Sequence, residues 1–183
     1  MAYPVLVNCF PKSGLHAVWK ACYLLGVNAQ TGHYGYGHQL PEGVEKHIFV
    51  KRDPRNALIS AVRFDEGTHS RGLQVTQGSV IAKFRAYWEK PFIEQISQCE
   101  GWLSDPSVLL IKYEDLIASD SEMLRIAEFV GTPWLDDAFE NLPGHTRTWN
   151  DVHSDYKTVW SDEIERVWAE GGGNDLLVRW GYG

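Results

Sequence analysis

The sequence predicts an α/β fold with three layers (α/β/α), in which helices cover both faces of a central, mainly parallel sheet. Three short apolar runs have the composition of buried strands and are separated by segments with helical periodicity; they are residues 5–7, 46–51 and 107–112. Strands that alternate with helices pair in parallel, because each return to the sheet runs through a crossover. The chain has 183 residues and no internal repeat, so we expect one domain over residues 1–183.

The composition is that of an ordinary globular protein without a basic surface. Apolar residues make up 44% of the chain, charged residues 22%, and the net charge is −7. This charge disfavours nucleic acid as a partner, so an anion site would be local. No apolar run reaches the roughly 20 residues of a membrane span, and no signal peptide is visible. The three cysteines lack metal spacing. We expect a cytoplasmic protein with reduced cysteines and no metal site.

The chain is organised around residues 5–19, VLVNCFPKSGLHAVW, which have the pattern of a buried strand, a tight turn and the start of a helix. Such a turn leaves unpaired backbone N–H groups at the positive end of the helix dipole, where a phosphate or sulfate binds well. Lys12 adds a charge, Ser13 a hydroxyl donor, and Gly14 a close backbone approach. The turn is neither a Walker A loop nor GxGxxG. By itself it also fits an ordinary β–turn–helix with a solvated lysine.

A glycine-rich and aromatic segment, residues 26–45, follows the first helix. Its glycines predict a long surface loop without a regular element from residue 31 to residue 43. Long loops on a rigid scaffold often carry function, and this one contains His33 and His38.

The second apolar strand is also followed by a helix start, in RDPRNALISAV, residues 52–62. Asp53 is placed to cap this helix, and Pro54 suits its first turn. Arg52 lies at the end of the strand, and Ser60 offers a hydroxyl two turns into the helix. The segment predicts a second anion site, and its alternative is a salt-bridged arginine with an incidental serine.

The rest of the chain continues the alternation of strands and helices. We expect a long helix over 79–98 kinked at Pro91, a helix over 119–130 ended by Gly131, a short helix over 133–142, and a helix over 161–170 capped by Ser161 and ended by glycines 171–173. Tyr113 follows the third strand. Ligands of parallel α/β folds bind beyond the carboxyl ends of the strands, so Lys12, Arg52 and Tyr113 are expected at one edge.

Taken in order, these segments resemble the sulfotransferase family that uses 3′-phosphoadenosine 5′-phosphosulfate (PAPS). PKSGLHA, residues 11–17, is similar to the PKSGTTW loop that binds the 5′-phosphosulfate in that family. RDPRNALIS, residues 52–60, is similar to the R-x-P-R-x-x-x-x-S segment that binds the 3′-phosphate. KYEDL at residues 112–116 and WGY at residues 180–182 resemble two later family motifs. The resemblance covers most of the chain.

The resemblance implies a P-loop-like sulfotransferase fold and an enzyme that moves a sulfuryl group from PAPS to a hydroxyl or amine. The product would be 3′-phosphoadenosine 5′-phosphate (PAP), and no metal would be needed. The implied donor-binding residues are Lys12, Ser13, Gly14, Leu15, His16, Arg52, Ser60, Tyr113 and Arg147. Among them, Lys12 would also stabilise the leaving phosphate, and Arg52 with Ser60 would hold the 3′-phosphate.

The resemblance also implies a catalytic base. The family carries it in a KTHLP-like segment, whose counterpart is GHQLP, residues 37–41, so His38 is the candidate. Histidine suits this role at neutral pH. His33 and His16 are the alternatives. The acceptor is expected to be a small molecule or a glycan-type or lipid-type compound, and its identity is not encoded in a readable motif.

Three departures from the family pattern keep other functions open. The two threonines of the family loop are Leu15 and His16 here. The tryptophan that stacks on adenine falls at Ala17, so stacking would come from Trp19, Trp149 or Trp160. Arg147 only approximates the late loop that completes the 3′-phosphate site. The alternatives are a P-loop-type nucleotide phosphotransferase and a non-catalytic nucleotide-binding or interaction module on the same fold.

Overall fold

The structure, a computed structural model, describes residues 4–65, 75–133 and 155–183. The chain divides into two compact units, one of Met1–Arg52 with Gly101–Asp151 and one of Asp53–Glu100 with Val152–Gly183. That residues 1–183 form one domain stays a prediction.

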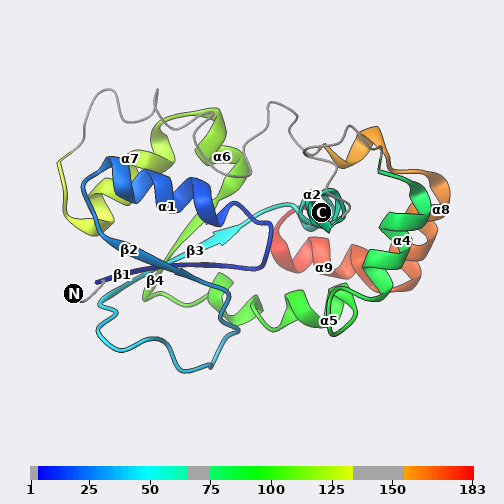
Figure 1. The fold of residues 1–183 in the computed structure, drawn as a ribbon, viewed down its shortest axis with the longest axis horizontal. Helices are drawn as coiled ribbons and strands as arrows, with labels where there is room; N and C mark the ends of the chain where they lie inside the picture. Colours follow the sequence, from blue (N-terminus) through cyan, green and yellow to red (C-terminus); the bar gives the residue numbers. More distant parts are fainter. Residues whose placement is uncertain (1–3, 66–74, 134–154) are drawn as a thin grey trace. The chain divides into compact units, whose positions relative to one another are not determined.

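The first unit is built on a parallel sheet with the strand order β2-β1-β3-β4 (Figure 1). The strands are β1 (Val5–Cys9), β2 (Ala29–Gly32), β3 (Lys46–Lys51) and β4 (Val108–Lys112). Every residue of β1 is buried, as in a sheet that is covered on both faces. The predicted α/β class with a mainly parallel central sheet is confirmed.

Strand β2 lies in the segment that the sequence assigned to a loop. It pairs with β1 from Val5↔Ala29 to Asn8↔Gly32, so the expectation of no regular element from residue 31 is wrong at its start. Only Ala29 of this edge strand is buried, and no apolar run marks it. Backbone pairing with β1, which local composition does not encode, forms this strand.

Three helices of the first unit lie on the same side of its sheet (Figure 1); they are α1 (Leu15–Leu24), α6 (Tyr113–Ala118) and α7 (Ser121–Val130). Their apolar residues form one core with β1, β3 and β4, including Val18, Ile48 and Ile126. Gly131 ends α7 in the left-handed conformation, as predicted. The sequence missed α6, which begins directly after β4.

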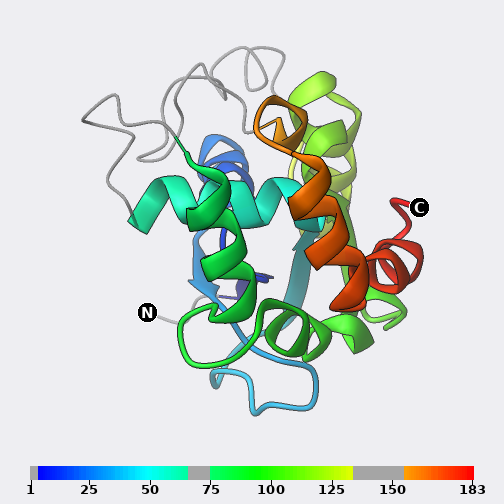
Figure 2. The same cartoon turned by 90° about the vertical axis from the view of Figure 1, so that its right-hand side faces the viewer.

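The second unit is helical, and Figure 2 shows its helices from a second side. It contains α2 (Pro54–Asp65), α4 (Gln77–Arg85), α5 (Phe92–Ser97), the 3-10 turn η2 (Tyr156–Thr158), α8 (Asp162–Glu170) and α9 (Gly173–Trp180). The predicted caps are confirmed. Asp53 accepts a bond from the N–H of Arg55 at 2.9 Å, and Ser161 accepts one from Ile164 at 3.3 Å.

The single kinked helix expected over residues 79–98 is wrong. Helix α4 ends at Arg85, Trp88 has a positive φ of 56°, and Pro91 is the N-cap of α5. Proline lacks an N–H and pushes the residue before it out of the helical region, so here it separates two helices. Gly171 ends α8 as predicted, but Gly173 begins α9. Residues 134–142 of the expected short helix lie outside the described residues.

Candidate functional site

The turn between β1 and α1 has an unusual backbone. Lys12 has a φ of 70° and Gly14 a φ of 102°, both in the left-handed region, and the N–H of Ser13 donates to the carbonyl of Phe10 at 3.2 Å. A lysine in this region is uncommon and costs conformational energy, which is the kind of strain found at ligand-binding loops. The turn therefore has the shape of a binding loop.

Gly14 is required at this turn for two reasons. Its positive φ disfavours a side chain, and an added Cβ would lie 2.2 Å from Cδ2 of Tyr113. Gly14 is also the N-cap of α1, and a glycine offers no side-chain cap to the first turn of the helix. The first N–H groups of α1 are thus left for an anion at the positive end of the helix dipole.

Ser13 gives an independent sign that the turn holds a ligand. Its residue is 0% exposed, and its Oγ has no hydrogen-bond partner among the described residues. Buried hydroxyls nearly always have a partner, so an unpaired one has to be accounted for. An oxygen of a phosphate or sulfate group would accept this hydrogen bond, and the turn therefore fits a 5′-phosphosulfate.

Arg52 connects the turn to the ends of two other strands. The residue follows β3, is 7% exposed, and donates from Nη1 to the carbonyl of Lys12 at 3.0 Å. Its guanidinium lies 4.6 Å from the centre of the Tyr113 ring, and Tyr113 follows β4. Burial raises the pKa of Tyr113, and the nearby Arg52 opposes this rise. The predicted meeting of Lys12, Arg52 and Tyr113 at one edge of the sheet is confirmed.

His33 lies beside this turn, directly after β2. Its Nδ1 is 2.9 Å from the carbonyl oxygen of Cys9 and 3.6 Å from the Cys9 Sγ. A carbonyl only accepts, so Nδ1 carries the proton and Nε2 is the basic nitrogen. Burial lowers the pKa of His33, the bond to Cys9 opposes this, and the charge of Lys12 lowers it further. His33 is therefore mainly neutral at pH 7.

The other two candidate histidines are, like His33, exposed. His38 lies farther along the loop that follows β2, with its backbone N–H donating to Gly35 at 3.3 Å and an exposed side chain. His16 is exposed on the first turn of α1. The catalytic role assigned to His38 stays a prediction, and of the two loop histidines it is His33 whose ring contacts the carbonyl of Cys9 at the end of β1.

The remaining candidate residues are spread over the chain. Leu15 is buried as the first residue of α1. Ser60 lies in α2 of the second unit and is half-buried. Arg147 and Trp149 lie outside the described residues. Trp19 donates its indole N–H to Ala29 at 3.1 Å, and Trp160 donates to Glu165 at 2.6 Å.

Asn8, the polar residue of the apolar strand VLVNC, was not among the residues predicted from the sequence. It is 0% exposed, and both ends of its amide bond the backbone of Tyr34. A buried polar residue in an otherwise apolar strand was the signal that could have identified it, because such a group needs partners.

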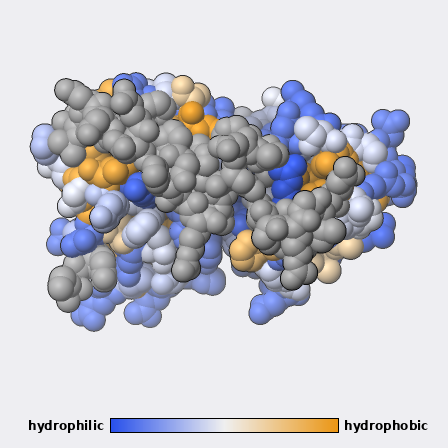
Figure 3. Space-filling model, turned by 45° about the horizontal axis from the view of Figure 1, so that its top comes forward, coloured by the Kyte–Doolittle hydropathy of each residue, from blue (hydrophilic) through white to orange (hydrophobic). Residues whose placement is uncertain are grey.

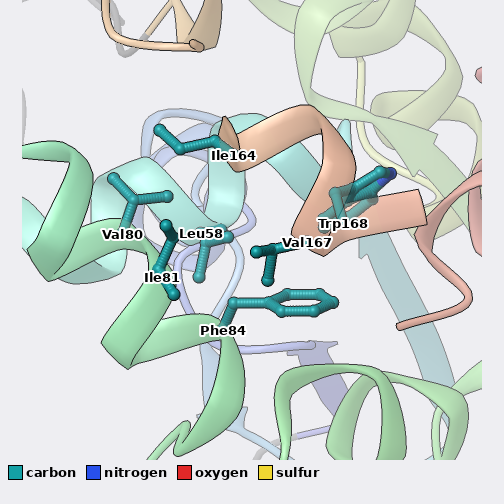
Figure 4. Close-up of a pocket in the computed structure, with 7 residues that line it drawn as sticks. All are labelled: Leu58, Val80, Ile81, Phe84, Ile164, Val167 and Trp168. Carbon is teal, nitrogen blue, oxygen red and sulfur yellow. The ribbon is translucent and has the colours of Figure 1, made fainter. Parts of the chain in front are cut away.

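An apolar depression in the second unit does not serve as a binding site. It is lined by side chains from α2, α4 and α8 (Figure 4); they are Leu58, Val80, Ile81, Phe84, Ile164, Val167 and Trp168. The side chains leave no space for a water molecule inside it. We assign it to the packing of the helices.

Figure 3 shows mainly hydrophilic residues on one face of the described surface, with apolar residues in small separate areas. Within residues 4–65, 75–133 and 155–183, no helix has the length and apolar character that crossing a membrane requires. The same ranges contain no group of three or more His, Cys, Asp or Glu residues that could hold a metal ion.

The chain belongs to the sulfotransferase domain family, whose model matches residues 36–162. This match includes Arg52, Ser60 and Tyr113. It begins after the turn at Lys12 and after His33, and so does not cover those residues. A comparison with curated protein sequences gives no match.

Solved structures show the same fold. The chain is similar to a mouse sulfotransferase, SULT7A1, in complex with PAP, with a TM-score of 0.69 and 16% identity over 92% of this chain and 82% of that one. It is also similar to a retinol dehydratase in complex with androsterone and the inactive cofactor PAP. There the TM-score is 0.67 and the identity 14%, over 97% of this chain and 81% of that one. The sulfotransferase fold is therefore shown.

Proposed function

We propose that this protein is a sulfotransferase that transfers a sulfuryl group from PAPS to a hydroxyl or amine of an acceptor and releases PAP. The observation that carries the proposal is the turn between β1 and α1, with its bond to Arg52 and its buried Ser13 hydroxyl, which has no partner among the described residues. The family supports the reaction class. Two proteins of the same fold were solved with PAP, which supports the choice of donor.

The turn would hold the 5′ end of the donor. The N–H groups from Gly14 to His16 and the Ser13 hydroxyl would donate to the phosphosulfate oxygens. PAPS supplies the activated sulfuryl group, and the ammonium of Lys12 would neutralise the charge that develops on the leaving phosphate.

Arg52 would bind the 3′-phosphate, as the resemblance implies. A guanidinium has five N–H donors, so Arg52 can keep its bond to the Lys12 carbonyl and still bind a phosphate. Because Tyr113 packs against both Arg52 and Gly14, it would keep Arg52 in a fixed position relative to the turn that holds the 5′ end of the donor.

A histidine would remove the proton of the acceptor hydroxyl, and the geometry favours His33. Its Nδ1–H is bonded to Cys9, which leaves Nε2 as the proton acceptor, and its lowered pKa keeps it neutral at pH 7. His38, the candidate from the sequence, lies in the same loop, and the side chains of both histidines are exposed. The effects of His33→Ala and His38→Ala on turnover distinguish the two candidates.

Calorimetric binding of PAP, ADP and ATP without metal tests the donor site. Wild type should prefer PAP, and Arg52→Ala should lose that preference. Arg125→Ala is the matched control, since Arg125 also donates to a backbone carbonyl of the first unit, that of Leu110 at 3.2 Å. It should bind PAP as wild type does. A magnesium-dependent preference for ATP, or no binding of PAP, would contradict the proposal.

Turnover of radiolabelled PAPS with a panel of alcohols, phenols and amines tests the reaction. We expect His33→Ala to lower kcat by a factor of about 100 or more at unchanged PAP affinity, as for loss of a general base. His38→Ala should leave kcat within twofold. The reverse result would assign the base to His38. Tight binding of PAP with no turnover on any acceptor would favour the non-catalytic module.

A further inference from the structure

The backbone of Tyr34, one residue beyond His33, is held by side chains from two other segments. Asn8 Oδ1 accepts from the Tyr34 N–H at 2.8 Å, and Asn8 Nδ2 donates to the Tyr34 carbonyl at 3.0 Å. The indole N–H of Trp102 donates to the same carbonyl at 2.9 Å. Three bonds thus satisfy the N–H and both lone pairs of the carbonyl of this residue.

Asn8 extends the sheet beyond its last backbone pair. The residue is paired with Gly32 in the β1–β2 ladder, where β2 ends. Its amide then bonds the N–H and carbonyl of Tyr34 as a neighbouring strand would. The orientation of the amide follows from the bonds, since only its oxygen can accept from an N–H. Asn8 therefore fixes the chain directly after β2, where the regular pairing stops.

Ring packing holds the same segment from a second side. The Tyr34 ring lies so close to Gly32 that a Cβ there would be 2.1 Å from it, and the Tyr36 ring lies equally close to Gly101. Trp102 packs edge-on against Tyr36, with ring centres 4.8 Å apart. Gly32, one of the glycines that made this segment look like a free loop, is thus a place where an aromatic ring contacts the backbone.

We propose that Asn8 and Trp102 are positioning residues that hold His33 in the tautomer and place required of a general base. His33 is bounded by Gly32, whose place is set by β2, and by Tyr34, whose backbone Asn8 and Trp102 fix. With both neighbours fixed, the ring keeps Nδ1 2.9 Å from the Cys9 carbonyl oxygen. This inference rests on the proposed role of His33 in sulfuryl transfer.

The electrostatic neighbours of His33 are the charge of Lys12, in the turn after β1, and the thiol of Cys9, in β1. Neither is altered by substitution of Asn8 or Trp102. A change in the His33 ring in those variants would therefore report its placement, and not a change in nearby charge.

Long-range proton–nitrogen NMR of the histidine rings tests this inference without turnover. The chain has seven histidines, and the His33 signals are those lost in His33→Gln. Wild type should show the Nδ1–H tautomer and a His33 pKa below 6.5. In Asn8→Ala and in Trp102→Phe, the Nε2–H tautomer should gain population and the pKa should move toward 6.5. Trp102→Phe keeps a ring against Tyr36, so it decides the question if Asn8→Ala does not fold.

Trp19→Phe is the matched control. It also removes an indole bond to a backbone carbonyl of the first unit, that of Ala29 at the start of β2. It should leave the His33 tautomer unchanged. We also expect the two positioning variants to lower kcat about tenfold or more, while PAP affinity stays within twofold, because the donor site does not include Asn8 or Trp102.

Two outcomes would overturn the inference. One is an unchanged His33 tautomer in both positioning variants, and the other is an equal change in Trp19→Phe. Failure of the proposed function would be seen differently. Either His33→Ala would leave turnover unaffected, or wild type would turn over no acceptor, and neither result depends on the His33 tautomer.

Discussion

Replacing Gly14 with alanine should destabilise the first unit and distort the donor turn. Two separate costs arise from one methyl group. An L-residue in the left-handed region costs about 1–2 kcal/mol, and Gly14 has a φ of 102°. The new Cβ would also lie 2.2 Å from Cδ2 of Tyr113, far inside the contact distance of about 3.5–4 Å between carbon atoms.

The size of the second cost follows from what must move. The atom in the way belongs to an aromatic ring that is itself packed against Arg52, so the ring or the turn has to shift by roughly 1 Å. Overpacking of this kind costs about 1–3 kcal/mol. The sum is about 2–5 kcal/mol, a large part of the roughly 5–15 kcal/mol that stabilises a typical domain.

Gly26→Ala separates the two costs. Gly26 has a φ of 73°, and an added Cβ would have no atom within 4 Å among the described residues. Alanine there should cost only the backbone part, about 1–2 kcal/mol. Urea unfolding followed by tryptophan fluorescence gives both values, provided that the m-value is unchanged.

A double substitution isolates the contact with the ring. In a Tyr113→Ala background the Cβ of alanine at residue 14 has space, so Gly14→Ala should then cost about as much as Gly26→Ala. Equal costs for Gly14→Ala and Gly26→Ala in the wild-type background would refute this reasoning. So would a cost of Gly14→Ala that does not depend on Tyr113.

Three further predictions concern acid–base behaviour, capping and thiol reactivity. The base must be neutral to accept a proton, and the pKa of His33 is lowered, so kcat should fall as the pH is lowered, with a midpoint below pH 6.5. A midpoint at or above pH 6.5, or a pH dependence that is abolished by His38→Ala alone, would contradict the role of His33. Ser161→Ala should lower the free energy of unfolding in urea by about 1 kcal/mol, because the bond to Ile164 is lost. Ser161→Asp should leave this free energy nearly unchanged, and equal losses in both variants would exclude a capping role. Burial raises the pKa of Cys22 and of Cys99 to about 12, so both thiols should react with a disulfide reagent only after unfolding; fast labelling of the native protein would contradict this.

The sequence alone determined the features whose causes lie within a few residues. Apolar runs and helical periodicity gave the α/β class, because burial acts on each strand or helix face separately. Asp53 and Ser161 were recognised as caps, because a cap bonds an N–H only two or three residues ahead. The turn at Lys12 was recognised because its charge, its hydroxyl and its glycine stand in three consecutive residues.

The tertiary structure decided everything that depends on distant partners. Strand β2 exists through pairing with β1, and the break between α4 and α5 cannot be told from a kink by a proline alone. Asn8 and Trp102 meet at Tyr34 across separations of 26 and 68 residues. The sequence offered His33, His38 and His16 for one role, and only the ladder that ends at Gly32 placed His33 against Cys9. Such contacts follow from how strands pair, and no local pattern encodes that.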